Sequence, residues 1–255
     1  MTAIKTVNLT KKFGDLTAVE NLELEIGFGE IFAFLGPNGA GKTTTVKLLT
    51  GLLRPTSGSA SISGFDIQKN PLEAKQLIGL VSDEPFVYQY LTGFEFMRFV
   101  GDIYSVPERE QKARIPELLE MFELKEWSGE LIETYSHGMK QKLVIASVLL
   151  HNPKVLVLDE PLVGLDPKSA RLVKDILLKL SERGVAVFMC THILEIAEKL
   201  AGRVAIIQRG KIIALESVEG LRKRTRQGIS GGGNLEDNFL ELTGGAEYAE
   251  VLKFL

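Results

Sequence analysis

Hydrophobic and polar positions alternate along the first part of the chain as they do in β-strands. Apolar residues stand at positions 4, 7 and 9, and between residues 19 and 26 they alternate with polar ones. Such alternation is typical of a strand with one buried face. Residues 31–35 are all apolar, which is typical of a strand covered on both faces. We predict three strands here, with Gly27 and Gly29 ending the second.

Predicted helices then alternate with predicted strands. A helix is expected after Thr44, to about residue 53, and short strands return over residues 56–82, among them 60–62 and 78–81. The later pattern predicts helices at 139–150 and 169–183, strands at 155–158 and 185–190, and a hairpin of 204–207 and 211–214 that turns at Arg209-Gly210. Strands that alternate with helices predict an α/β fold with a mainly parallel sheet.

Two segments depart from this alternation. Residues 83–127 read as helical and rich in aromatic and acidic side chains, and we expect Phe94, Phe96 and Phe99 to pack inside a helical subdomain. Aromatic residues just before that helix, namely Phe86, Tyr88 and Tyr90, are loop residues that would suit an interface. After residue 216 the pattern weakens, so residues 228–255 are predicted to be a glycine-rich flexible linker and a short helical tail, with the helix at 234–242.

Composition and charge narrow the class of protein. The 255 residues are 45% hydrophobic and 25% charged, which is usual for a globular domain. The net charge of −3 argues against a surface that coats nucleic acid, so no nucleic-acid partner is expected. The single cysteine, Cys190, allows no intrachain disulfide and fits a reducing compartment. No apolar run approaches the roughly 20 residues that span a bilayer.

A phosphate-binding motif follows the predicted strand at 31–35. Residues 36–43 match G-x-x-x-x-G-K-[ST] and precede a predicted helix, as that motif requires. The backbone N–H groups of such a turn, together with the helix N-terminus, surround phosphate oxygens. Lys42 would add charge at the β- and γ-phosphates, and the Thr43 hydroxyl would bind Mg²⁺. The candidate nucleotide-binding residues are Gly36, Pro37, Asn38, Gly39, Ala40, Gly41, Lys42, Thr43 and Thr44.

Two carboxylates end the apolar strand at 155–158. Asp159 and Glu160 would be costly at that place unless they bind a cation or accept hydrogen bonds. Asp159 is expected to hold Mg²⁺, directly or through water. Glu160 is expected to orient or deprotonate a water that attacks the γ-phosphate. The carboxylate pair is a weak signal by itself, and it becomes strong beside the phosphate loop.

Further motifs resemble those of one family, over residues 1–216. The segment Tyr135-Ser136-His137-Gly138-Met139 is similar to the Leu-Ser-Gly-Gly-Gln signature of ATP-binding-cassette (ABC) transporter ATPases, and the segments Gly164-Leu165-Asp166-Pro167 and Thr191-His192 follow in that family's order. The tail of the signature resembles bacterial export-type members, such as drug, antibiotic or sodium exporters. The resemblance implies a RecA-like phosphate-loop core with a mainly parallel sheet, an N-terminal antiparallel β subdomain and an inserted α-helical subdomain.

The resemblance also implies roles and boundaries. The ABC ATPase domain would be residues 1–227, with the core and β subdomain at 1–82 and 152–216 and the helical subdomain at about 83–151. ATP with Mg²⁺ would bind, and Phe13 would stack on adenine. Lys42, Glu160 and His192 would be catalytic, with His192 donating a hydrogen bond to the γ-phosphate. Ser136, Gly138 and the loop that carries Asp166 would serve the nucleotide held by another subunit.

Two positions depart from the family pattern. Asp83 stands where the family has a glutamine, and His137 stands where it most often has glycine. We expect Asp83 to reach Mg²⁺ only through water, or to stay withdrawn until a partner docks. His137 is left with two interpretations: its ring lies near the arriving γ-phosphate, or it faces solvent and only its backbone matters.

The expected function is that of the ATP-hydrolysing motor subunit of a membrane exporter, at the cytoplasmic face of the plasma membrane. The partners would be an integral membrane permease on a separate chain, and a second copy of this chain or a paralogous ATPase subunit. The alternative is a soluble ABC-type ATPase that regulates another assembly, although such relatives usually carry two cassettes or a long coiled-coil insert. Another phosphate-loop enzyme, a kinase or a GTPase, is disfavoured by the signature-like segment at 135–139 and by the lack of an Asn-Lys-x-Asp motif.

Overall fold

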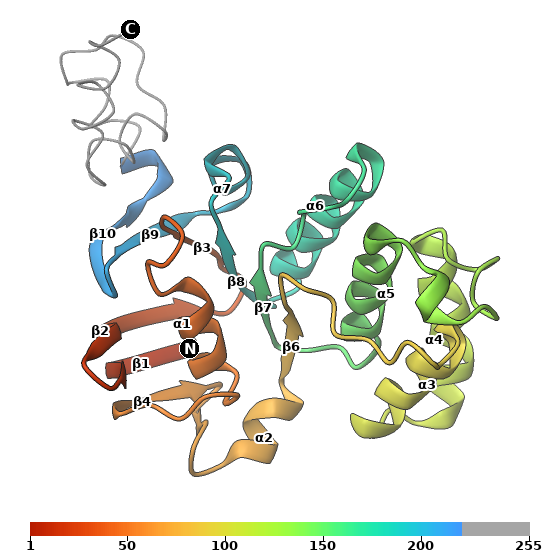
Figure 1. Cartoon of the computed structure of the whole chain (residues 1–255), viewed down its shortest axis with the longest axis horizontal. Coiled ribbons are helices and arrows are strands. Elements are labelled where there is room, and N and C mark those ends of the chain that lie inside the picture. The colour runs from red at the N-terminus through yellow and green to blue at the C-terminus, as the bar shows by residue number, and fades with distance from the viewer. Residues whose placement is uncertain (221–255) are drawn as a thin grey trace, which may run out of the picture.

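Two β-sheets organise residues 1–220, the part of the chain that the computed structural model describes (Figure 1). One is a four-stranded sheet of order β2-β1-β4-β5, and the other is a six-stranded sheet of order β10-β9-β3-β8-β7-β6. The first is antiparallel, and in the second every neighbouring pair except β9–β10 is parallel. The predicted fold class is therefore confirmed.

The antiparallel sheet comes from the alternating segments near the N-terminus. Its strands are β1 (Thr2–Phe13), β2 (Leu16–Gly27), β4 (Ser57–Ile62) and the short β5 (Phe65–Asp66). Along β2, the apolar residues Val19, Leu22, Leu24 and Ile26 are buried, and the polar residues that alternate with them are more exposed. Along β1, Ile4 and Leu9 are buried as expected, but Val7 is exposed and the polar Thr6 is buried. Strand β1 runs further than the predicted segment and ends at Phe13, which pairs with Leu16 across a tight turn.

The larger sheet has an apolar layer on each of its faces. Its strands are β3 (Ile31–Leu35), β6 (Ile78–Val81), β7 (Val155–Asp159), β8 (Ala186–Thr191), β9 (Arg203–Gln208) and β10 (Lys211–Ser217). Along β3, Phe32 and Phe34 belong to one core cluster, whereas Ala33 and Leu35 belong to the other. Both faces of β3 are thus covered, as its unbroken apolar run predicted.

Parallel pairing brings several strand ends to one edge of this sheet. Leu35 of β3 pairs with Thr191 of β8, and Asp159 of β7 pairs with Cys190. The segments that follow β3, β7 and β8 therefore begin beside one another. These segments carry the phosphate-loop motif, Glu160 and His192, which lie far apart in the sequence.

Helices around the core differ in part from the prediction. Those near the core are α1 (Lys42–Leu49), α2 (Pro71–Gln76), α6 (Pro167–Glu182) and α7 (Leu194–Leu200). The sequence patterns did not indicate α2 and α7. The predicted end of the first helix at residue 53 is wrong: α1 ends at Leu49, because Gly51 has a left-handed backbone with φ of 66°.

A helical layer lies on the side of the molecule opposite the antiparallel sheet (Figure 1). It consists of α3 (Gly93–Ile103), α4 (Glu108–Met121), the 3₁₀ turn η1 (Ile132–Thr134) and α5 (His137–Leu150). Phe96 is buried as expected, but Phe94 and Phe99 are 41% and 38% exposed, so the prediction that they pack inside is wrong. Helix α3 buries only the face that carries Phe96, Met97 and Gly101.

The predicted linker at 228–233 and tail helix at 234–242 lie outside the described residues, and the division of the chain at residue 227 stays a prediction. Within residues 1–220, no helix is both long and apolar enough to cross a membrane.

Candidate nucleotide-binding site

The phosphate loop joins β3 to α1 and needs its glycines for two physical reasons. Gly39 and Gly41 have left-handed φ angles of 77° and 112°. A Cβ atom at Gly36 would lie 2.4 Å from the carbonyl oxygen of Ile207, and one at Gly41 would lie 2.4 Å from that of Ala18. Gly41 is also the N-cap of α1 and supplies no side-chain cap, so the first N–H groups of the helix remain available to an anion.

Lys42 is held at the centre of this loop. Its side chain is almost fully buried, and Nζ donates to the carbonyl oxygens of Gly36 at 2.7 Å and Pro37 at 3.2 Å. Two neutral carbonyl oxygens do not neutralise an ammonium group. A phosphate in the loop would supply the missing negative charge.

A cleft of about 570 Å³ connects the loop to Phe13. Its lining residues are Phe13, Leu16, Thr17, Ala18, Pro37, Asn38, Gly39, Gly41, Lys42, Thr43, Thr44, Arg209 and Gly210. The Phe13 ring is half exposed and has Lys11 Nζ 5.1 Å from its centroid. At one end of the cleft, an aromatic ring is thus available to stack on a nucleotide base. At the other end, the phosphate loop is available to the phosphates.

Asp159 ends β7 beside the loop and is nearly inaccessible to solvent. Burial raises the pKa of its carboxyl, a hydrogen bond with Thr43 opposes this, and the nearby Glu160 and Asp83 raise the pKa further, with Lys42 lowering it. Three carboxylates and one hydroxyl therefore lie within electrostatic reach of one another. A dication would relieve their repulsion.

These residues fit Mg²⁺ bound together with a nucleotide. Thr43 and Asp159 are oxygen donors of the kind that Mg²⁺ prefers, and Asp83 is exposed in the segment after β6. Among residues 1–220, no cluster of three or more His, Cys, Asp or Glu side chains could hold a metal ion. An ion at this place would therefore depend on phosphate oxygens and water for most of its ligands.

Glu160 and His192 contact each other at the ends of β7 and β8. The Glu160 carboxylate accepts from Thr191 Oγ1 and from the His192 backbone N–H, both at 3.0 Å, and its Oε1 lies 2.7 Å from His192 Nδ1. Glu160 itself has a φ of 49°, and its N–H donates to Cys190. A left-handed non-glycine residue is strained, so the surrounding strand ends determine where this carboxylate points.

The hydrogen bond at Nδ1 has a chemical consequence for His192. When Nδ1–H donates to Glu160, a neutral imidazole has only an acceptor at Nε2, and Nε2–H can donate only if the ring is protonated. A hydrogen bond from His192 to a γ-phosphate therefore requires the imidazolium, or a switch of the ring away from Glu160.

The predicted signature residues lie apart from the cleft. None of Ser136, His137, Gly138 and Asp166 lines it, and Ser136 caps α5 by accepting from the Met139 N–H at 3.2 Å. Asp166 caps α6, because its Oδ1 accepts from the N–H groups of Lys168 and Ser169, both at 3.0 Å. The structure thus divides the predicted site residues between two surfaces of one chain.

His137 is exposed, but its ring is placed against the loop before α6. A Cβ atom at Gly164 would lie 2.5 Å from His137 Cδ2, and one at Gly138 would lie 2.9 Å from the Gly164 carbonyl oxygen. Gly164 also has a left-handed φ of 78°. Neither interpretation of His137 anticipated this contact, which joins the first turn of α5 to the loop that carries Asp166.

The sequence did not indicate five residues of the cleft wall, namely Leu16, Thr17, Ala18, Arg209 and Gly210. Arg209-Gly210 was identified as a hairpin turn, but no local pattern places that turn beside the phosphate loop. The placement depends on the pairing of β9 with β3.

Comparisons with known proteins identify the class. The family model described as "ABC transporter" matches residues 19–163, and one described as an AAA domain, putative AbiEii toxin, matches residues 129–198. A solved ATP-binding subunit of an ABC transporter superposes with a TM-score of 0.88 at 29% identity, covering 94% of this chain and 99% of that one. A dimeric ATP-binding cassette in a post-hydrolysis state with ADP and Pi superposes with a TM-score of 0.76 at 28% identity, covering 84% of this chain and 98% of that one. The chain belongs to the ABC transporter family.

Curated relatives place it within that family. The bacitracin transport ATP-binding protein BcrA of Bacillus licheniformis is 39% identical over 227 residues, covering 89% of this chain and 73% of the relative. The linearmycin resistance ATP-binding protein LnrL of Bacillus subtilis is 38% identical over 212 residues, covering 83% and 68%. The chain is an ATP-hydrolysing, ATP-binding subunit of an ABC transporter, and its resemblance to export-type members is confirmed.

Proposed function

We propose that this subunit powers the export of an antibiotic or related drug through a membrane permease on a separate chain. The similarity to proteins named for bacitracin transport, linearmycin resistance and daunorubicin resistance supports this substrate class. Those relatives are transporter subunits, so the alternative of a soluble regulatory ATPase has no comparable support. The subunit would be peripheral, at the cytoplasmic face of the plasma membrane.

In the proposed mechanism, the phosphate loop and Lys42 bind the β- and γ-phosphates. Thr43 and Asp159 would hold Mg²⁺, with Asp83 reaching it through water, and the bound ion would neutralise charge on the phosphate oxygens. Glu160 would accept a proton from the attacking water, and the backbone N–H of His192 and the Thr191 hydroxyl keep its carboxylate oriented.

Head-to-tail dimerisation would complete the site. The observation that carries this proposal is the separation of Ser136, Gly138 and Asp166 from the cleft that Phe13 and the phosphate loop share. Ser136 opens α5 at an exposed position, where a phosphate brought by another subunit would meet the helix N-terminus. Two copies of this chain, or one copy and a paralogous subunit, would enclose two ATP molecules.

The test uses Glu160→Gln, which keeps the size of the side chain but removes the base. We expect ATP binding to remain, hydrolysis to fall by about 100-fold or more, and a dimer to accumulate with MgATP in size-exclusion chromatography with light scattering. The control adds Ser136→Asp, which keeps a capping side chain on α5 but places a negative charge there. The double variant should bind ATP as a monomer. A Glu160→Gln protein that binds ATP and stays strictly monomeric would contradict the proposal.

The surface proposed to meet the permease lies between β6 and α3. Phe86, Tyr88 and Tyr90 are 81%, 60% and 84% exposed, and the Tyr88 ring packs edge-on against Phe99 with centroids 5.2 Å apart. Large exposed aromatic side chains are effective interface anchors. Phe86→Ser with Tyr90→Ser should abolish co-purification with the permease and leave ATP affinity unchanged, whereas Leu72→Ser, at an equally exposed site on α2, should leave both unchanged.

A further inference from the structure

Arg209 stands at the tip of the β9–β10 hairpin and lines the nucleotide cleft together with Phe13 and the phosphate loop. Its side chain is exposed, and it has a left-handed backbone with φ of 48°. A non-glycine residue keeps such a conformation only when its surroundings impose it. The position of Arg209 at the cleft is therefore set by the contacts of the hairpin.

Those contacts fix the hairpin to both walls of the cleft. The Gly210 N–H donates to the Ala40 carbonyl at 2.9 Å, and the Gly210 carbonyl accepts from the Glu20 N–H at 2.8 Å. A Cβ atom at Gly210 would lie 2.9 Å from the carbonyl oxygen of Ala18. The turn is thus held against β2 and the phosphate loop at once.

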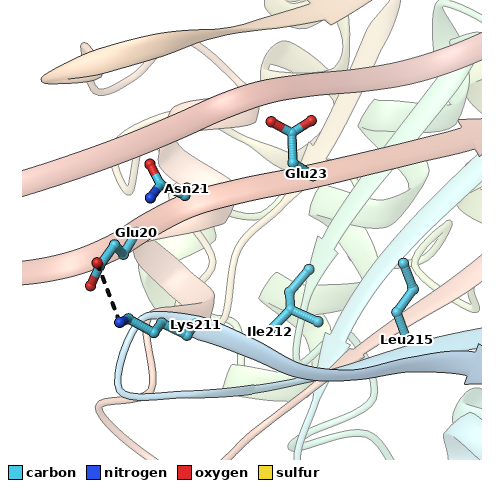
Figure 2. Close-up of a pocket in the computed structure, with 6 residues that line it drawn as sticks. All are labelled: Glu20, Asn21, Glu23, Lys211, Ile212 and Leu215. Carbon is cyan, nitrogen blue, oxygen red and sulfur yellow. Dashed lines mark ion pairs between the residues drawn. The ribbon is translucent and has the colours of Figure 1, made fainter.

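The two cations of this turn have different surroundings. Lys211 forms an ion pair with Glu20 at 3.3 Å and lines a separate cleft of about 390 Å³ between β2 and β10 (Figure 2). Arg209 does not line that second cleft, and its guanidinium has no hydrogen bond or ion pair within residues 1–220. A free guanidinium beside the phosphate loop is available to a ligand.

We propose that Arg209 contacts the base and sugar of the bound nucleotide. Within the cleft, the turn lies against Thr17 and Ala18, which follow the Phe13 turn, whereas Asp159 and Glu160 do not line the cleft. A guanidinium is planar and carries only donors, which suits ribose hydroxyl oxygens and adenine ring nitrogens. Phosphate binding stays with Lys42. This inference rests on ATP binding and is independent of dimerisation and export.

The experiment measures equilibrium affinities for ATP, ADP and inorganic tripolyphosphate with wild type, Arg209→Ala, Arg209→Gly and the control Lys211→Ala. We expect both Arg209 variants to lower the affinity for ATP and the affinity for ADP equally, by about fivefold. The affinity for tripolyphosphate should change by less than about twofold. Arg209→Gly keeps a residue that favours the left-handed turn, so its effect separates the lost side chain from a disturbed hairpin. Lys211→Ala should leave all three affinities within about twofold, because exposed ion pairs contribute little.

Unchanged ATP affinity in the Arg209 variants would overturn the proposal. An equal loss for tripolyphosphate would also overturn it, because Arg209 would then bind phosphate. Wild-type ATP binding, measured in the same series, separates either result from a failure of the nucleotide site itself.

Discussion

The cleft around the phosphate loop and the surface around the first turn of α5 hold their polar groups in different ways. Around the phosphate loop, Lys42 at the start of α1 and Asp159 at the end of β7 are buried with only partial compensation of their charge. On the other surface, Ser136 and Asp166 are exposed and already cap helices of their own chain. The cleft is therefore prepared for a ligand in the monomer, whereas the second surface is ordered without one. The difference supports two steps, with nucleotide binding first and dimerisation second.

The largest expected effect is a loss of ATP binding caused by a change in the cleft alone. Lys42→Ala removes the ammonium group and should weaken ATP binding on the order of 100-fold, because a charge-assisted contact to phosphate is lost. Lys47→Ala, an exposed change on the same helix, is the control and should have no effect. Ser136→Ala, on the second surface, should leave the ATP affinity of the monomer within about twofold. Titration of labelled ATP at a protein concentration that keeps the chain monomeric makes the comparison, and an equal loss in Ser136→Ala would contradict the division into two surfaces.

The next effect concerns the second surface. Gly164→Ala imposes a side chain on a left-handed backbone and drives a methyl group into the His137 ring, so we expect a loss of about 2–3 kcal/mol in the free energy of unfolding. Adding His137→Gly should recover part of this loss by removing the ring. Chemical denaturation of the single and double variants measures both the loss caused by Gly164→Ala and the part that His137→Gly recovers. Additive effects would show that the ring and Gly164 do not interact.

A third prediction concerns His151, which follows α5 and contacts both the helical layer and β6 of the core. His151 stacks on Tyr104 with ring centroids 3.7 Å apart, and its Nε2 lies 3.2 Å from the Ile78 carbonyl oxygen. Burial lowers the pKa of His151 to about 4, the hydrogen bond with Ile78 opposes this, and the charge of Arg114 lowers the pKa further. Arg114 is held nearby by the carbonyl oxygens of Leu149 at 2.9 Å and of the Asn152 side chain at 2.7 Å.

The sign of the pH effect follows from these pKa values. Because the folded chain disfavours the protonated ring, unfolding takes up a proton between the unfolded pKa of 6.5 and the folded value of about 4. His151 should therefore cost about 2.5 kcal/mol of stability as the pH falls from 6.5 to 4. His151→Gln does not titrate and can still donate to Ile78, so its stability should fall less over this range. Identical pH profiles of unfolding free energy for the two proteins would refute the prediction.

The smallest effect concerns Asp83, which lies within electrostatic reach of Asp159 and precedes the exposed aromatic residues Phe86, Tyr88 and Tyr90 in the chain. Asp83 is exposed, so Asp83→Gln should leave basal hydrolysis within about tenfold, or 1.4 kcal/mol in the barrier. Asp83→Ala should mainly lower stimulation by the permease. ATPase rates with and without the permease measure both. A loss of basal activity in Asp83→Ala as complete as in Glu160→Gln would make Asp83 a primary catalytic group.

The sequence by itself determined the parts of the protein that rest on local patterns. The phosphate loop, the carboxylates Asp159 and Glu160 at the end of β7, the hairpin at Arg209-Gly210 and the alternation of strands with helices all follow from hydrogen-bonding and burial rules that act over a few residues. The family resemblance then supplied the order of the remaining motifs. Each predicted strand is present in the structure, with ends displaced by a few residues.

Only the tertiary structure decided which of these parts meet. The neighbours of β3 in its sheet are β8 and β9, which come from residues more than 150 positions later in the chain, so no local pattern places His192 on Glu160 or Arg209 beside the phosphate loop. The exposure of Phe94 and Phe99 likewise depends on which face of α3 meets its neighbours. The physical reason is that the residues near a position in the sequence determine whether it lies in a strand or a helix. The contacts of its side chain depend instead on the order in which distant strands pair.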